Sequence, residues 1–471
     1  MARPDYCEGS KLAYAVPPRG RPAPPVKLVG DQFVKVSDGS PVAIHGINWF
    51  GFNNGMTWLN GLWAGGKSGN SDFATIVYEL QLLGFNAIRL PYIFKDLKAP
   101  STQIGGYCTG AHTLNELAER TIDPEYRGPM NKQAPQPVVP LPDIPGPGTC
   151  NTYIPGGQTI DRYMWSVQWL IANGWYVLID NHPMSQEMTS HSAKDFIDGW
   201  KWVWSKFSCL PNFEEDMKGR LFLDILNEPD SQRQGWQPNE SGAAGMTELY
   251  LGVMDALWEM TPGLPIFFVE GGGQGAYKGI NWGNGFITNT TLIESMSHDW
   301  TTRITDANPF FKALMKRPYL DRVVISPHVY GPSVSNRRDG MAVGPTLWEA
   351  LDTSFGYLNQ ARNFGGGGGA APWKGYCADG TCHTFPVAIG EFGSRFVDKD
   401  DMEHLRDFTM WLRNEGPGNT GKHRPVGNFF YSNSGDTGGL VKDTWHEWEW
   451  EKIRYLQQRF GLKPWFAASA E

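Results

Sequence analysis

The sequence predicts an α/β fold, a single (β/α)8 barrel with long loop insertions. Three observations lead to this prediction: short apolar runs recur along the chain, helical stretches alternate with them, and polar residues directly follow several of the runs. Strands of a parallel barrel are buried on both faces, so they read as nearly continuous hydrophobic runs. Eight runs of this kind lie at residues 42–49, 86–90, 175–180, 221–226, 265–270, 323–327, 386–390 and 427–431.

Helices are expected between these runs. Asp72 is placed to cap a helix with one apolar face, and Gly84 is placed to end it before the second strand. Residues 161–173 repeat the pattern and stop before Gly174, where the third strand follows. A last helix is expected at about 448–460. Each strand is thus separated from the next by a helical connection, as a barrel of parallel strands requires.

The chain is longer than the roughly 250 residues of a typical barrel. We therefore expect insertions after the second and fifth strands, at about 92–157 and 271–300, and both would emerge at the end where active sites form. Residues 128–150 are rich in proline and cannot make a regular helix. The expected organisation is a Pro-rich N-terminal arm over residues 1–30 and one catalytic domain over 31–465.

Composition excludes several classes of partner. The formal net charge is −8 and the pI is about 5.7, whereas nucleic-acid binders carry basic patches that neutralise phosphates. No apolar run reaches the roughly 20 residues needed to span a bilayer. We expect neither a nucleic acid nor a membrane as a partner, and a monomer in solution.

Six cysteines stand at positions 7, 108, 150, 209, 377 and 382. They show no Cys-x-x-Cys pair and no histidine at zinc spacing, so no metal site is expected. The favoured interpretation is a disulfide between Cys377 and Cys382 across a tight loop, and another between Cys108 and Cys150 around a Pro-rich excursion. Buried free thiols are the alternative. Disulfides indicate an oxidising compartment, so we expect a secreted protein.

Two glutamates carry the functional prediction. Glu228 and Glu391 each sit just past a short apolar run, in widely separated parts of the sequence. The C-terminal ends of barrel strands converge on one site, so such residues can meet there. Two carboxyl groups at one site are what the hydrolysis of a glycosidic bond requires.

Several motifs resemble the ordered signatures of glycoside hydrolase family 5, close to its endo-β-1,4-glucanases. They cover about residues 42–460 and are His45-Gly-Ile-Asn-Trp-Phe-Gly-Phe, Gly84-Phe-Asn-Ala-Ile-Arg-Leu-Pro-Tyr, Ile179-Asp-Asn-His, Asn227-Glu-Pro, His328-Val-Tyr, Ile389-Gly-Glu-Phe-Gly and Ser434-Gly-Asp-Thr-Gly-Gly. A single motif of this length would be a weak signal, but seven in the right order make a chance match improbable.

The resemblance implies a role for each of these positions. It assigns Glu228 as the acid/base, with a raised pKa, and Glu391 as the ionised nucleophile. It implies that Asn227 binds the sugar 2-hydroxyl, that Arg89 lowers the pKa of the nucleophile, and that Tyr330 donates to Glu391. His182 and His328 are expected to support the site or bind substrate, without transferring protons; the alternative is that each is a satisfied core histidine.

Aromatic side chains are expected to stack on the sugar units. Trp49 and Trp282 match positions where relatives place such platforms. Relatives usually carry a tryptophan at the end of the eighth strand, whereas this chain reads Asn428-Phe-Phe-Tyr-Ser, so Phe430 or Tyr431 is expected to take that role.

The resemblance therefore implies retaining, endo-acting hydrolysis of a β-1,4-glucan polysaccharide, with no cofactor. A β-mannanase or a mixed-linkage β-glucanase remains open as an alternative, because these enzymes share the barrel and the acids and differ in their loops. A non-hydrolytic β-glucan-binding protein is the alternative from a different class. The presence of both Glu228 and Glu391 argues against it.

Overall fold

The structure is a computed structural model of the whole chain. It describes residues 5–62, 72–102, 104, 112–142, 150–183, 192–232, 234–238, 242–272, 282–295, 305–335, 342–359, 375–413, 415, 428–432, 439–442 and 447–468. The chain divides into two compact units: unit 1 holds Met1–Ser10, Pro24–Ala43 and Leu178–Phe430, and unit 2 holds Lys11–Ala23, Ile44–Val177 and Tyr431–Glu471. The single domain expected over residues 31–465 stays a prediction.

Each of the eight predicted apolar runs contains or overlaps a strand. The strands are β3 (Ile44–Asn48), β4 (Ala87–Tyr92), β5 (Tyr176–Asn181), β6 (Leu221–Asp224), β7 (Phe267–Val269), β8 (Val323–Ile325), β12 (Ala388–Gly393) and β13 (Asn428–Ser432). A short strand β9 (His328–Tyr330) follows β8 almost at once. The predicted runs match the strands because barrel strands are buried on both faces. Strands β4, β5, β6 and β12 are buried at every position.

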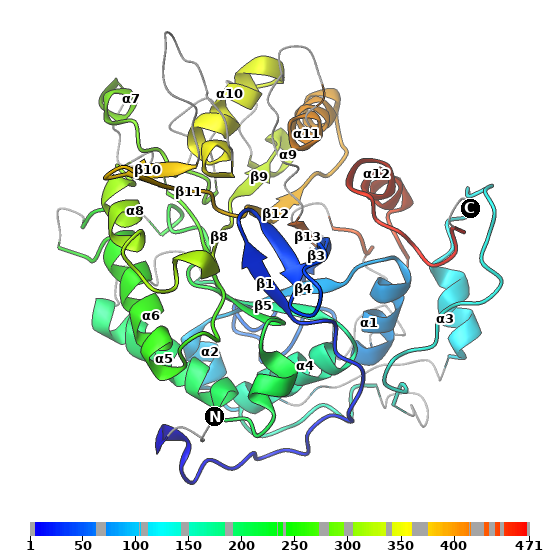
Figure 1. Cartoon of the computed structure of the whole chain (residues 1–471). Coiled ribbons are helices and arrows are strands. Elements are labelled where there is room, and N and C mark those ends of the chain that lie inside the picture. The colour runs from blue at the N-terminus through cyan, green and yellow to red at the C-terminus, as the bar shows by residue number, and fades with distance from the viewer. Residues whose placement is uncertain are drawn as a thin grey trace. The chain divides into compact units, whose positions relative to one another are not determined.

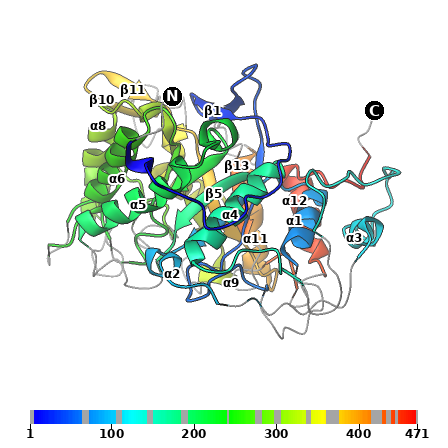
Figure 2. The same ribbon diagram turned by 90° about the horizontal axis from the view of Figure 1, so that it is seen from below.

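Unit 1 is built on parallel strands covered by helices. Strand β7 pairs in parallel with both β6 and β8, and β12 pairs in parallel with β9. The helices of unit 1 are α5 (Ala193–Ser208), α6 (Met246–Met260), α7 (Thr290–Ser295), α8 (Asn308–Leu314), α9 (Pro332–Ser335), α10 (Gly344–Ser354) and α11 (Lys399–Leu412). Short helical turns are η1 (Asp5–Cys7), η3 (Phe213–Met217), η4 (Leu320–Arg322) and η5 (Gly356–Asn359). Helices α5 and α6 pack side by side in both views (Figures 1 and 2).

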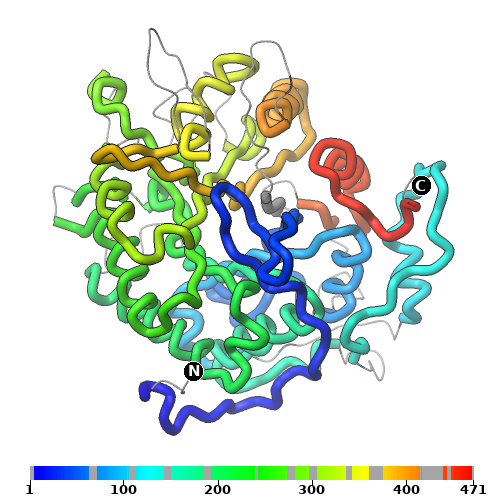
Figure 3. The backbone as a smooth tube through the Cα atoms, viewed as in Figure 1, coloured from blue at the N-terminus to red at the C-terminus, as the bar shows by residue number. Residues whose placement is uncertain are grey.

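A hairpin near the N-terminus packs against the unit 1 strands. Strands β1 (Val26–Val29) and β2 (Gln32–Lys35) are antiparallel and form the blue loop of Figure 3. The ring of Phe33 packs 5.6 Å from that of Phe222 in β6, so the hairpin contributes to the core. The first strand of the chain is therefore β1, not the run at 42–49, and the end of the expected Pro-rich arm is part of a hairpin. The sequence signal was weak because β1 is short and half exposed.

Disulfides account for every described cysteine. Cys377 joins Cys382, as predicted, across the turn between β10 (Tyr376–Ala378) and β11 (Thr381–His383). A second disulfide joins Cys7 to Cys209, which ties η1 to the end of α5 within unit 1. Cys150 is also disulfide-bonded. Its predicted partner Cys108 lies outside the described residues.

Unit 2 contains the parallel pair of β3 and β4 with the helices α1 (Phe73–Leu82), α2 (Phe94–Leu97), α3 (Leu114–Arg120), α4 (Thr159–Ala172) and α12 (Trp450–Phe460). The Asp72 carboxylate caps α1 by accepting the backbone N–H of Thr75, as predicted. Gly84 has a left-handed φ of 101°, and a Cβ there would lie 2.6 Å from the carbonyl oxygen of Lys463. Only glycine fits that position, which is why the helix stops before β4.

A buried ion pair joins two helices of unit 2. Glu79 of α1 is 1% exposed, and its Oε1 lies 3.7 Å from Nη1 of Arg120 in α3. Burial raises the pKa of Glu79 to about 8, although Arg120 opposes the shift. Helix α3 lies inside the insertion expected after the second strand, and a Thr113–Glu116 capping box begins it.

Among the described helices, none is both long enough and apolar enough to cross a bilayer. The described part of the Pro-rich segment, residues 128–142, contains no helix, as its proline content predicted.

Candidate active site

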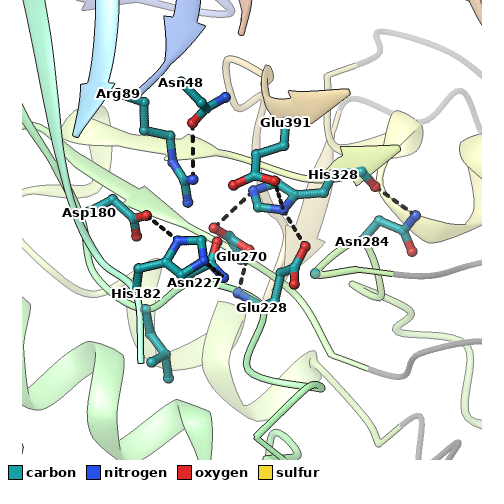
Figure 4. Close-up of polar contacts among 12 residues, drawn as sticks. Asn48, Arg89, Asp180, His182, Asn227, Glu228, Glu270, Asn284, His328 and Glu391 are labelled. Atoms are coloured by element: carbon teal, nitrogen blue, oxygen red, sulfur yellow. Dashed lines mark hydrogen bonds and ion pairs between the residues drawn. The ribbon is translucent and has the colours of Figure 1, made fainter. Parts of the chain in front are cut away.

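The two glutamates singled out in the sequence come together in unit 1. One carboxylate oxygen each of Glu228 and Glu391 and one ring nitrogen of His328 all lie within 4.8 Å of one another. The carboxylates are reached by solvent only at their edges, with side-chain exposures of 14% for Glu228 and 11% for Glu391. Figure 4 shows both carboxylates pointing toward the ring of His328.

Strand pairing sets this geometry. Glu391 of β12 is the register partner of His328 in β9, and Tyr330 follows on the same face of β9 because side chains alternate along a strand. The Tyr330 hydroxyl donates to Oε2 of Glu391 at 2.7 Å, as predicted. Gly390 is required here, since a Cβ at that position would lie 2.9 Å from Nε2 of His328.

Glu228 is held by its backbone as well as by its side chain. It follows β6 with a left-handed φ of 39°, which is strained for any residue other than glycine. Its N–H donates to Oε2 of Glu270 at 2.8 Å, and its Oε1 lies 2.9 Å from Nδ1 of His328. His328 and Glu270 are both fully buried, so these contacts are shielded from water.

The electrostatics of the site favour a protonated Glu228. Burial is the largest cause and raises its pKa to about 8. A hydrogen bond donated by His328 would oppose the shift, and the charges of Glu391 and Asp230 add to it. Burial also raises the pKa of Asp230 to about 6, against the opposing effect of a hydrogen bond from the Gly283 backbone. A carboxyl group that is protonated near neutral pH, close to a second carboxylate, is suited to general acid catalysis.

A second polar chain fixes the amide of Asn227. Nδ1 of His182 lies 2.8 Å from Oδ2 of Asp180, and Nε2 of the same ring lies 3.2 Å from Nδ2 of Asn227. With Nδ1 donating to the carboxylate, Nε2 accepts from the amide. The Asn227 oxygen is thereby oriented away from the histidine. Asp180 was part of a recognised motif, but the sequence gave no separate reason to expect it to orient His182.

The other predicted residues stand as follows. Trp282 is half buried, and its carbonyl oxygen accepts the N–H of His328 at 3.2 Å, so it borders the site in unit 1. In unit 2, Arg89 is fully buried and donates from Nη1 to Oδ1 of Asn48 at 3.2 Å (Figure 4). Its predicted pairing with Glu391 stays a prediction, as does the platform role of Trp282.

Trp49 of unit 2 has a packing role in the structure. It is 1% exposed, it stacks on Phe73 with ring centroids 5.9 Å apart, and its Nε1 donates to the carbonyl oxygen of Asn60. A sugar platform needs an exposed face, so this burial gives the predicted role no support. The backbone of β13 is present where the eighth strand was expected, but the side chains of Phe430 and Tyr431 lie outside what the structure describes.

Sequence reasoning missed Glu270 altogether. It follows the apolar run Ile266-Phe-Phe-Val, so it has the same signal that singled out Glu228 and Glu391. Asn284 was also missed; its Nδ2 donates to the carbonyl oxygen of His328 at 3.1 Å and so helps to fix the start of β9. No local pattern marks an asparagine with this function.

Two groups of described side chains have the donor types that a cation accepts. One is Glu228, His328 and Glu391; the other is the fully buried set Asp180, Asp224 and Glu270, whose nearest oxygens lie within 4.8 Å of one another. The first group already contains the two acids, and the second has further polar partners within the fold. Neither is assigned to a metal.

Comparison with known proteins shows which family and which proteins this chain is similar to. The family model "Cellulase (glycosyl hydrolase family 5)" matches residues 147–418. The "Major extracellular endoglucanase" of Xanthomonas campestris pv. campestris is 23% identical over 479 residues, covering 96% of this chain and 74% of that protein. The "Endoglucanase" of Paenibacillus polymyxa is 23% identical over 440 residues, covering 89% of this chain and 83% of that protein.

Solved structures show the fold. A hyperthermophilic endocellulase from the archaeon Pyrococcus horikoshii superposes with a TM-score of 0.58 at 20% identity, covering 92% of this chain and 98% of that one. A cellulase solved as an inhibitor complex gives a TM-score of 0.59 at the same identity. These likenesses confirm the predicted fold class, a (β/α)8 barrel, and at this level of identity they bear on the fold alone.

Proposed function

The chain belongs to glycosyl hydrolase family 5 and is a glycoside hydrolase, and from this premise we propose that it cleaves internal β-1,4 bonds of a cellulose-type glucan with retention of configuration. The observation that carries the proposal is the approach of the Glu228 and Glu391 oxygens to within 4.8 Å. Retaining enzymes hold their two carboxyl groups about 5 to 5.5 Å apart, whereas inverting enzymes need about 6.5 to 9.5 Å to admit a water molecule.

In the proposed first step, Glu391 attacks the anomeric carbon while Glu228 protonates the departing glycosidic oxygen. The Tyr330 hydroxyl donates to Glu391 and stabilises it as a carboxylate. Glu228 begins protonated because its pKa is about 8. The bond to the leaving sugar breaks and a covalent glycosyl–enzyme ester forms.

In the second step, Glu228 has become a carboxylate and acts as the base. It removes a proton from water, which attacks the anomeric carbon and releases Glu391. The sugar leaves with its original configuration, because two inversions have occurred. No cofactor enters either step.

The remaining predicted residues are assigned to substrate binding. The amide of Asn227, oriented by His182, is proposed to bind the sugar 2-hydroxyl, an interaction that strengthens as positive charge builds on the ring. Arg89 is proposed to lower the pKa of Glu391. Trp282 is proposed as a sugar platform, and the same role is retained for Phe430 or Tyr431, at the position where relatives carry a tryptophan.

The names of the relatives support the substrate class. The two relatives described above are named endoglucanases, and one of them is named extracellular. We infer a β-1,4-glucan as substrate and export into an oxidising compartment, the latter also in keeping with the disulfides Cys7–Cys209 and Cys377–Cys382. A β-mannanase or mixed-linkage β-glucanase stays the alternative, because loops select the substrate on this fold.

The test is product analysis on a panel of substrates. Release of reducing ends from carboxymethyl cellulose, barley β-glucan and mannan separates the glucanase from its alternatives. Proton NMR of the first product formed from a cellooligosaccharide reports its configuration before mutarotation. Faster release from mannan would reassign the substrate, an initial α-product would exclude the double displacement, and binding without hydrolysis of any polymer would exclude the enzyme.

A further inference from the structure

Glu270 stands beside the two acids of the site and has no role in the proposed reaction. It lies just past β7, it is fully buried, and it was not expected from the sequence. Its two carboxylate oxygens face different partners: Oε2 accepts the backbone N–H of Glu228 at 2.8 Å, and Oε1 lies 3.1 Å from Nε2 of His328. Figure 4 shows the carboxylate directed at both.

We propose that Glu270 is a positioning residue that holds Glu228 in place and selects the tautomer of His328 that keeps Glu228 protonated. The inference rests on the proposed function, since it assigns Glu228 the role of acid/base.

The first part of the argument concerns the backbone. Glu228 adopts a φ of 39°, a conformation that side-chain-bearing residues rarely take unless their surroundings impose it. The carboxylate of Glu270 meets the backbone N–H of that same residue, and a hydrogen bond to a charged acceptor in a buried place is among the stronger kinds. Glu270 therefore supplies a restraint on the backbone from which the acid side chain projects.

The second part concerns the proton on His328. A carboxylate can only accept, so the proximity of Oε1 favours a proton on Nε2, even though the angle of this contact falls short of a regular hydrogen bond. Nδ1 of the neutral ring is then an acceptor. It lies 2.9 Å from Oε1 of Glu228, so that contact is satisfied only when Glu228 carries the proton. The tautomer thus favours the acid form that the first step uses.

The surroundings keep Glu270 in this position. A Cβ on Gly283 would lie 2.5 Å from Oε2 of Glu270, so the space beside the carboxylate is filled. The backbone of Glu270 is held separately from this carboxylate, since the Tyr250 hydroxyl donates to its carbonyl oxygen at 2.9 Å. The acidic groups described nearby are Asp180 and Asp224 beside Glu270, and Glu391 and Asp230 near Glu228. Removing one negative charge from this set also eases ionisation of Glu228.

The test replaces Glu270 by glutamine, which has nearly the same shape. The glutamine oxygen can still accept from Glu228, but its amide group would donate to Nε2 and move the histidine proton to Nδ1, where it stabilises ionised Glu228. We expect kcat/KM for a cellooligosaccharide to fall by about 10- to 100-fold. This is a part of the rate acceleration that general acid catalysis provides. The alkaline limb of its pH profile should move down by about one pH unit. For 2,4-dinitrophenyl β-cellobioside, whose leaving group needs no proton, kcat/KM should change little.

Tyr250→Phe is the matched control, because it removes a buried hydrogen bond to the backbone of Glu270 and leaves the carboxylate in place. It should keep the pH profile of the unmodified enzyme. Glu270→Asp provides a second variant if Glu270→Gln does not fold: its shorter side chain draws the same carboxylate away from His328 and should produce the same selective loss. Equal losses on the two substrates, an unmoved alkaline limb, or the same shift in Tyr250→Phe would each overturn the proposal.

A spectroscopic readout separates this inference from the proposed function. Nitrogen-15 spectra of histidine-labelled protein should show His328 protonated on Nε2 in the unmodified chain and on Nδ1 in Glu270→Gln. An unchanged tautomer would refute the positioning role even in an active enzyme. Absence of hydrolysis by the unmodified chain would instead refute the proposed function.

Discussion

Glu228 in unit 1 and Glu79 in unit 2 share one property and differ in everything else. Burial raises the pKa of each to about 8. Glu79 lies inside helix α1 with a single charged partner, Arg120, and is 1% exposed. Glu228 follows a strand, its side chain is 14% exposed, and a histidine and a second carboxylate lie beside it.

This contrast shows that a perturbed pKa measures burial and becomes a sign of function only through its neighbours. Glu228 is partly exposed, lies beside the proposed nucleophile Glu391, and has a ring nitrogen of His328 close enough to accept a hydrogen bond from its protonated form. Glu79 has none of these among the described residues and serves to join two helices. Substitutions at or around each glutamate should therefore affect different quantities, turnover for one and stability for the other.

The largest effect on turnover is expected from Glu391→Gln. It removes the proposed nucleophile and keeps the shape, so kcat on carboxymethyl cellulose should fall on the order of 10⁴-fold or more. Glu79→Gln should leave kcat within about a factor of two, since it lies outside the proposed site. Comparable losses in both variants would mean that Glu391 acts only through the stability of the fold.

A smaller loss is expected from Tyr330→Phe, which removes the hydroxyl that donates to Glu391. A hydrogen bond to a charged group contributes about 1.5 to 3 kcal/mol, so kcat/KM should fall about 10- to 100-fold. Steady-state kinetics on a cellooligosaccharide measure this effect. A change below twofold would show that the ionisation of Glu391 does not depend on this contact.

The pH dependence of kcat/KM should depend on Glu228 and not on Glu79. Glu228 must be protonated to act, so kcat/KM should decline by about tenfold per pH unit once the pH exceeds its pKa of about 8. Glu79→Gln should keep the same alkaline limb. A limb near pH 5 in the unmodified enzyme would contradict the assignment of Glu228 as the buried acid.

Substitution of Glu79 should leave turnover nearly unchanged. It should instead change how the free energy of unfolding depends on pH. The unfolded chain ionises Glu79 near its usual pKa of 4.5 and the folded chain only near 8, so stability is lost as the pH rises between these values. Glu79→Gln should flatten the pH dependence of the unfolding free energy by about 3 kcal/mol between pH 5 and pH 8. Urea melts at both values test this, with the exposed Glu119→Gln as control.

Most of the fold could be predicted from the sequence because barrel strands have a strong local signal. Strands such as Ala87–Tyr92 and Tyr176–Asn181 are buried throughout and mostly apolar, and glycines such as Gly84 mark where the preceding helix must stop. The hairpin of β1 and β2 was missed because its strands are short and β1 is half exposed. The link from Cys7 to Cys209 spans 202 residues, and spacing alone cannot choose such a pair.

The site was predicted only in part. Motifs with a recognisable order named Glu228, Glu391, His328 and Tyr330, and the structure brings these four together in unit 1. Glu270 escaped because no motif contains it, although it ends an apolar run just as the two acids do. The platform role of Trp49 stays a prediction, since a tryptophan can pack in a core as well as stack on a sugar.

The left-handed backbone at Glu228 has a practical consequence for capturing bound oligosaccharides. Holding a glutamate at a φ of 39° costs roughly 1 to 3 kcal/mol, and glycine takes that conformation freely. Glu228→Gly would therefore remove the acid and relax the chain at once. Such an inert enzyme should melt at a higher temperature than its active parent, which suits long soaks with intact sugar chains.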